Sequence, residues 1–135
     1  MKGEEKKRIR RRDMEEKKGI IVKKSFELAL NAVKGYKYLA EERREFVMSK
    51  QLLRSGTAVG ALIREAQNAE SKKDFIHKLG IAQKECDETI YWIELLLASE
   101  YLDALHADVI QTRAEEMLRL LKSAILTVKQ NLTRG

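Results

Sequence analysis

Residues 108–132 read DVIQTRAEEMLRLLKSAILTVKQNL, and the spacing of their apolar side chains decides the fold class. Apolar residues recur three or four positions apart, at Ile110, Ala114, Met117, Leu121, Ala124, Val128 and Leu132. This is the period of an α-helix that buries one face, whereas a half-buried strand would alternate at every second residue. The stretch therefore predicts one long amphipathic helix.

Three earlier segments show the same spacing and predict helices over residues 20–40, 46–68 and 73–98. Ser71 is a plausible N-cap for the third, and residues 41–45 and 99–107 are expected to connect helices. No proline and no strand pattern interrupts the series. The chain is therefore predicted to be all-α, an antiparallel up-down-up-down four-helix bundle. The expected buried stripes are Val22, Phe26, Ala29, Val33, Tyr36 and Ala40; Leu52, Gly56, Val59, Ile63 and Ala66; and Phe75, Leu79, Ala82, Cys86, Ile90, Ile93 and Leu97.

Length and composition fit a single bundle domain, which we place at residues 20–135. The chain has 135 residues and is 44% hydrophobic, enough for one core. Glu94 interrupts the longest apolar run well short of the ~20 residues that span a membrane. No signal-peptide pattern is visible, and the single Cys86 fits a reducing compartment. We expect a cytoplasmic protein without a membrane partner.

The positive charge is concentrated at one end of the sequence. The net charge is +6, and residues 1–24 alone hold eleven Lys or Arg against five Asp or Glu, so residues 25–135 are neutral. Residues 1–19 are therefore interpreted as a basic extension that attracts polyanions such as RNA or DNA. The alternative is a solvated, partly helical extension that aids solubility. The candidate nucleic-acid-binding residues are Lys6, Lys7, Arg8, Arg10, Arg11, Arg12, Lys17, Lys18, Lys23, Lys24, Lys50, Arg54 and Arg64.

Four-helix bundles can hold di-metal sites, but the residues that such sites need are missing. Those sites use Glu-x-x-His pairs, whereas this sequence has only Asp74-x-x-His77 and Asp103-x-x-His106. Both pairs fall near predicted helix ends, where Asp74 is interpreted as a capping residue and His106 as a loop residue. No metal site and no cofactor are expected.

The remaining chemically capable side chains are interpreted as structural. Glu85 and Glu88 share one helical face, and Glu65 lies in the preceding predicted helix. Each is expected to have a cationic neighbour in its own helix, such as Lys84, Arg64 or Lys78. A structural role is favoured over acid/base chemistry, and one such role is an inter-helix pair with Arg54 or Arg64. Cys86 falls on an apolar stripe and is interpreted as a core residue. We therefore predict no catalytic residue, no enzymatic activity and no small-molecule substrate.

Two features of the predicted helices concern packing. Gly56 and Gly60, with neighbouring alanines, would let another helix approach closely. Residues 73–98 also carry more apolar surface than one bundle normally buries, which predicts a subunit interface. The alternative is a wide core-facing surface with scattered exposed side chains. The additional apolar residues are Ile76, Ile81, Trp92, Leu95 and Leu96.

Several short motifs together resemble a known family. They are QLLRSGTAVG at 51–60, IREA at 63–66, AES at 69–71, FIHKL at 75–79, Ala82, KE at 84–85, ET at 88–89, YW at 91–92 and KSFELA at 24–29. The chain resembles the bacterial four-helix bundle proteins encoded in intervening sequences of 23S rRNA genes, which are described as ribosomal-protein-like. The similarity covers about residues 20–100.

The resemblance implies a ring-like homopentamer without known enzymatic activity. It also implies a relation to the accessory protein of diversity-generating retroelements, which partners a reverse transcriptase and binds nucleic acid. The matched residues would serve packing and assembly: Gly56 and Gly60 for close helix contact, Phe75 and Trp92 for packing, Arg54 and Glu65 for a polar contact. Leu62, where many members have asparagine, and the basic extension depart from the family pattern.

These observations lead to one hypothesis and one alternative. The hypothesis is a non-enzymatic homo-oligomer that binds RNA or a nucleic-acid complex electrostatically. The alternative is a structural or protein-interaction module, for example one that partners a reverse transcriptase, without direct nucleic-acid binding.

Overall fold

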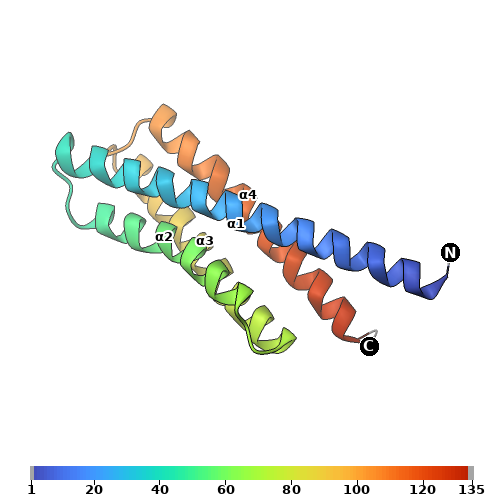
Figure 1. The fold of residues 1–135 in the computed structure, drawn as a ribbon. Coiled ribbons are helices and arrows are strands. Elements are labelled where there is room, and N and C mark those ends of the chain that lie inside the picture. Colours follow the sequence, from blue (N-terminus) through green and yellow to red (C-terminus); the bar gives the residue numbers. More distant parts are fainter. Residues whose placement is uncertain (1, 134–135) are drawn as a thin grey trace.

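Four α-helices run alternately up and down the molecule in the computed structural model, which describes residues 2–133 (Figure 1). They are α1 (Gly3–Glu41), α2 (Met48–Gln67), α3 (Lys72–Ala98) and α4 (Ala104–Thr133), and the described residues contain no strand. Each helix packs against the next one along the chain, and α4 closes the bundle against α1. The predicted all-α four-helix bundle is confirmed. The last two residues of the predicted domain, 134 and 135, lie outside the described residues.

The core stripes of α2 and α4 are buried as predicted, apart from the terminal Leu132, which is exposed. In α3 the stripe shifts at two positions, because Thr89 and Leu96 are buried in place of Ile90 and Leu97. Leu96, which the sequence pattern placed at a possible interface, is a core residue.

The buried face of α1 was predicted one residue out of register. The structure buries Ile21, Ser25, Leu28, Ala32 and Leu39 and leaves Phe26 58% exposed. Both sets of residues have helical spacing, so periodicity could not choose between them. The choice follows from the contact with α2, where the small Ala32 and Ser25 face Gly56 and Gly60. The larger Phe26 has no room on that face.

The first helix is also longer than predicted, because it begins at Gly3 rather than at Ile20. Lysine, arginine and glutamate, which fill this segment, are good helix formers, and Gly19 costs only ~1 kcal/mol inside a helix. The side chain of Met14 packs against the core. As a result the first half of α1 continues past the α2–α3 turn, with α4 beside it (Figure 1).

Two helix starts are fixed by carboxylates. The Glu45 carboxylate accepts hydrogen bonds from the backbone N–H groups of Val47, Met48 and Ser49, at 3.0, 3.1 and 2.7 Å, and so caps the start of α2. Asp103 likewise accepts from the His106 N–H at 2.8 Å, so α4 begins at Ala104 instead of near Asp108. His106 therefore lies in the first turn of α4 and not in a loop, which corrects the sequence-based interpretation.

Candidate nucleic-acid interface

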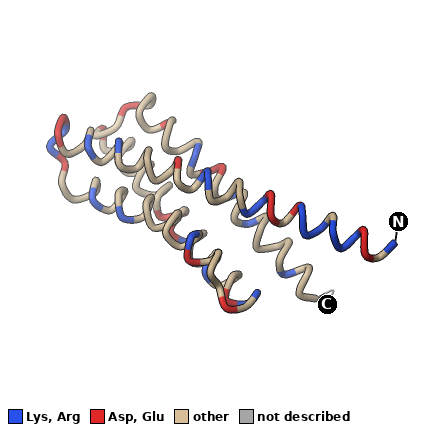
Figure 2. The backbone as a smooth tube through the Cα atoms, in the orientation of Figure 1, with Lys and Arg blue, Asp and Glu red and all other residues tan. Residues whose placement is uncertain are grey.

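Residues 3–24 of α1, which we call the basic half of this helix, are exposed along most of their length. Figure 2 shows lysine and arginine, with a few acidic residues among them, along this part of the helix, which continues past the α2–α3 turn beside α4. Two lysines have acidic partners, since Lys18 lies 3.6 Å from Glu15 and Lys24 lies 3.1 Å from Glu116 of α4. The following candidates on this helix lie at least partly open to solvent: Lys6, Lys7, Arg8, Arg10, Arg11, Arg12, Lys17 and Lys23.

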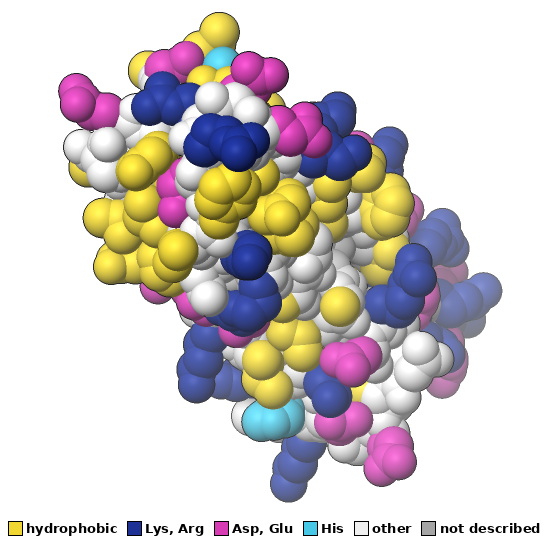
Figure 3. Space-filling view, turned by 90° about the vertical axis from the view of Figure 1, so that its left-hand side faces the viewer, with side chains coloured by type: hydrophobic (Ala, Val, Ile, Leu, Met, Phe, Trp, Pro, Cys, Tyr) yellow, Lys and Arg dark blue, Asp and Glu magenta, His cyan; other side chains and the backbone are white. Residues whose placement is uncertain are grey.

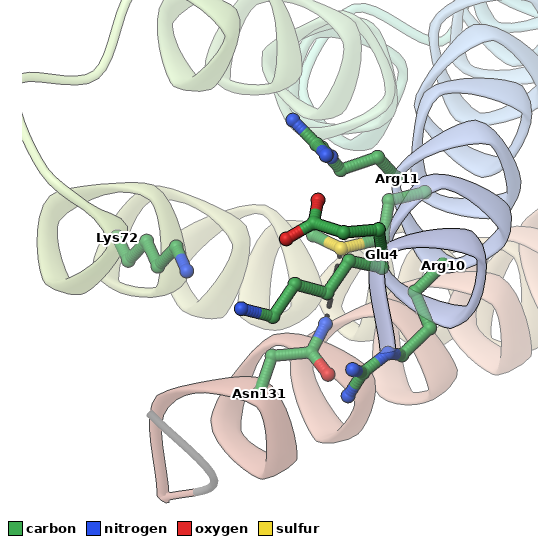
Figure 4. Close-up of a pocket in the computed structure, with 7 residues that line it drawn as sticks. Glu4, Arg10, Arg11, Lys72 and Asn131 are labelled. Atoms are coloured by element: carbon green, nitrogen blue, oxygen red, sulfur yellow. Dashed lines mark hydrogen bonds between the residues drawn. The ribbon is translucent and has the colours of Figure 1, made fainter. Parts of the chain in front are cut away.

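Some of these cations line an open cleft of about 490 Å³ between three helices. Lys7, Arg10 and Arg11 reach it from α1, together with Glu4 and Met14. Lys72, the first residue of α3, and Asn131, near the end of α4, form the other sides (Figure 4). The Asn131 amide lies 3.0 Å from the Met14 sulfur and joins α4 to α1 at this point. We call this feature the basic cleft.

Lys72 and Asn131 were not among the residues singled out from the sequence. An antiparallel bundle places the start of α1, the start of α3 and the end of α4 at the same end of the molecule. The signal that could have found Lys72 is thus its position directly after the Ser71 N-cap. The contribution of Asn131 required the real length of α1, which the sequence did not show.

The candidate cations on α2 differ in how far their charge is compensated. Lys50 and Arg64 are exposed. Arg54 instead bridges two helices, because its guanidinium donates to Glu85 at 2.8 Å and to Glu88 at 2.5 Å. The hydrogen bond from Arg54 lowers the pKa of Glu88. The expected inter-helix pair with Glu85 and Glu88 is therefore present, and two carboxylates compensate the charge of Arg54.

The residues assigned to packing occupy different environments. A Cβ atom on Gly56 would lie only 2.6 Å from the Cβ of Ala32, so α1 and α2 pack closely there. Gly60 faces the backbone of Ser25. Phe75 is buried, with the Lys18 ammonium 5.1 Å from its ring centroid. Two further residues are less enclosed: Trp92 is half-buried and donates to Glu88 at 3.1 Å, and Glu65 is exposed.

Groups with chemical potential are held in structural roles. The Cys86 thiol is buried and donates to the Ala114 carbonyl at 3.1 Å, and burial raises its pKa to about 12. At neutral pH it is therefore a thiol and a poor nucleophile. Asp74 accepts from the Glu70 N–H at 3.2 Å, while the Ser71 hydroxyl accepts from the Asp74 N–H at 3.0 Å, which confirms the predicted cap.

The two histidine motifs do not form a metal site. Within residues 2–133, no three His, Cys, Asp or Glu side chains gather in a way that could hold a metal ion. His106 stacks on Tyr38 with ring centroids 4.2 Å apart and lies 2.8 Å from Asp103. In the same part of the chain, none of the helices combines the length and hydrophobicity required to cross a bilayer.

Residues 17–123 match the family described as 23S rRNA-intervening sequence protein. The chain belongs to this family. It is also similar to a crystal structure of a protein of unknown function from the S23 ribosomal protein family of Bacteroides thetaiotaomicron VPI-5482. That similarity has 50% sequence identity and a TM-score of 0.79, and it covers 81% of this chain and 97% of the other. No curated protein matches significantly.

The family match does not cover most of the basic cleft. Lys72 lies inside the matched residues, whereas Lys7, Arg10, Arg11 and Asn131 lie outside them. The bundle of this chain is thus the family's, while most of the cleft is built from its two flanking segments.

Proposed function

We propose that the chain is a non-enzymatic, homo-oligomeric bundle protein of the cytoplasm that binds RNA, alone or in a nucleic-acid complex, through the basic half of α1. One observation carries the proposal. The whole net charge of +6 resides on residues 1–24, and nearly all of these residues belong to a helix that extends beyond the α2–α3 turn (Figure 2). An exposed row of cations of this kind attracts polyanions.

The same helix is poorly suited to a membrane surface. Helices that lie on membranes need a continuous apolar face. Residues 2–19 offer only two large apolar side chains, the exposed Ile9 and the partly buried Met14. The segment also lacks aromatic residues for stacking on bases. Contacts would therefore be made to phosphates, with little sequence preference and a steep dependence on salt.

Exposed apolar side chains support the homo-oligomeric part of the proposal. Phe26 and Leu30 on α1 are 58% and 46% exposed, and Leu126 on α4 is 58% exposed. Figure 3, which views the molecule from the end opposite the basic cleft, shows several patches of hydrophobic side chains on the visible face. Such patches favour contacts between proteins. The number of five copies rests on the family resemblance, and a pentamer would gather five basic helices and raise the avidity for a polyanion.

The test compares RNA binding by full-length variants. In the first, Lys6, Lys7, Arg8, Arg10, Arg11 and Arg12 are replaced by glutamine; in the second, Lys50 and Arg64 are replaced by glutamine. Fluorescence anisotropy with a labelled RNA of about 20 nucleotides is recorded at about 50 and 200 mM salt, and light scattering reports the mass of each sample. Full-length substitution is preferable to truncation at Ser25, because Ile21 is part of the core.

We expect the first variant to lose binding and the second to retain it, with a steep loss for wild type at the higher salt. Loss in the second variant alone would move the binding surface to the bundle. If wild type does not bind RNA at low salt, the alternative of a protein-interaction module, for example one that partners a reverse transcriptase, is favoured. The neutral charge of residues 25–135 and their exposed apolar side chains are the observations behind that alternative.

A further inference from the structure

The six basic residues within residues 6–12 of α1 separate into two sets by whether they line the basic cleft. Lys7, Arg10 and Arg11 line the basic cleft. Lys6, Arg8 and Arg12 are exposed but do not line it. The two sets therefore differ in position although they carry the same charge and lie in the same stretch of helix.

The cleft brings together like charges from different elements. Lys72 belongs to α3 and is far from Arg11 along the chain, yet both line the same space (Figure 4). Glu4 is the single carboxylate among the lining residues, against four cations. Within residues 2–133, none of these four cations forms an ion pair. The four positive charges are therefore free to interact with an anion that enters the cleft.

The types of side chain indicate which anion fits. Guanidinium groups such as those of Arg10 and Arg11 bind phosphate oxygens through two parallel hydrogen bonds, and a lysine ammonium binds phosphate as a point charge. Asn131 adds an amide donor at the edge of the cleft. The cleft is also open to solvent, so a polymer backbone has access to these side chains.

We propose that the basic cleft holds the phosphodiester backbone of the bound RNA. The RNA then bridges the basic half of α1 and the start of α3. This inference rests on the proposed function and locates its binding site. It differs from attraction to a basic helix in one respect: it gives a role to Lys72, which is not part of that helix.

Lys72 and Lys73 provide a matched pair for the test. They are adjacent, exposed and equally charged, but only Lys72 lines the cleft. Lys72→Gln and Lys73→Gln are made separately in the full chain, and the affinity for the labelled RNA is measured over a range of salt. We expect Lys72→Gln to weaken binding and to reduce the salt slope by about 1, whereas Lys73→Gln leaves both unchanged.

Two triple variants test the α1 side of the cleft. The cleft variant carries Lys7→Gln, Arg10→Gln and Arg11→Gln, and the outward variant carries Lys6→Gln, Arg8→Gln and Arg12→Gln, so each loses three charges. We expect the cleft variant to bind RNA at least about tenfold more weakly than the outward variant at about 100 mM salt. Circular dichroism serves as the control, and we expect both variants to keep the helix content of wild type.

The outcomes separate this inference from the proposed function. If both triple variants lose equal affinity and the two lysine variants behave alike, the cleft is overturned while electrostatic RNA binding stands. If wild type does not bind RNA, both fall. Vesicles of phosphatidylserine serve as a second probe, and Lys72-dependent binding to vesicles without binding to RNA would also overturn the inference.

Discussion

At the scale of single residues, Gly56 marks a close contact between α1 and α2. Because an added Cβ would lie 2.6 Å from the Cβ of Ala32, Gly56→Ala must push the two helices apart. We expect the free energy of unfolding to fall by about 1–3 kcal/mol, although alanine is the better helix former. Urea denaturation followed by circular dichroism measures the change.

Gly80 supplies the matched control, because it also lies inside a helix but a Cβ there would meet no atom within 4 Å. Gly80→Ala should therefore raise the free energy of unfolding by up to about 1 kcal/mol. Equal stabilities for the two variants would contradict the close contact between α1 and α2.

The glycine in α2 and the face of α1 show what could be predicted for individual residues. The sequence indicated correctly that Gly56 permits a close helix contact, since a glycine on an apolar stripe leaves space for the backbone of a neighbouring helix. It did not identify Ala32 as the partner. On α1 two stripes of equal spacing compete, and only the fit of Ala32 and Ser25 against α2 decides between them.

At the scale of helices, the start of α2 depends on Glu45. Its side chain is buried in the cap, and burial acts to raise its pKa, but hydrogen bonds from the backbone of Ser49, Val47 and Met48 outweigh burial and hold the pKa below the ordinary value of 4.5. A carboxylate with a lowered pKa stabilises the fold above its unfolded-state pKa. That contribution is lost as the pH falls through the folded-state pKa.

Replacing Glu45 by alanine should therefore destabilise the protein by about 1–2 kcal/mol at pH 7. The difference from wild type should shrink as the pH falls below 4.5. Urea denaturation across this pH range measures it, and Glu42→Ala, which removes the same charge from an exposed position in the same turn, is the control. A difference that does not depend on pH would mean that the charge of Glu45 plays no part in the cap.

Helix boundaries were the least predictable part of the fold. The starts of α1 and α4 both lie earlier than the sequence suggested, and the reasons are different. Residues 3–19 lack an apolar stripe, so hydrophobic spacing cannot reveal that they are helical. The sequence pattern places Asp103 within a connecting segment, whereas its carboxylate caps α4.

At the scale of the molecule, residues 3–13 at the start of α1 should be the first segment to unfold locally. Residues 3–13 contribute no buried side chain, whereas α2 and α3 bury a full stripe each. Segments with few buried contacts unfold locally at low cost and are cleaved first. Limited trypsin digestion should therefore cut among residues 6–18 before it cuts the bundle.

Mass spectrometry of the products identifies the cleavage sites. A persistent fragment that begins between residues 7 and 19 would agree with the predicted boundary between the extension and the bundle. Simultaneous cleavage after Arg43 or Arg44, in the α1–α2 connection, or after Lys73, in the first turn of α3, would contradict it. Bound RNA should slow cleavage of the extension if it occupies the cleft.

The fold class was predictable because four long amphipathic segments with short connections leave few alternative arrangements. The set of residues that line the cleft was less predictable from the sequence. The lysines and arginines of residues 6–12 were visible as a charged cluster, but their separation into two sets depends on the rotation of α1 about its axis. Lys72 joins them only through the three-dimensional arrangement of helix ends.

An even number of alternating helices returns the chain to the end where it started, so Lys2 and Thr133 both lie at the end that carries the cleft (Figure 1). An affinity tag on either terminus, or a biosensor surface coupled through it, would stand beside the cleft. The opposite end of the bundle holds the α1–α2 and α3–α4 connections. Arg43 of the first connection donates a hydrogen bond to the carbonyl of Glu100 in the second, at 3.1 Å. A fluorophore or an immobilisation handle placed there would leave the cleft unobstructed.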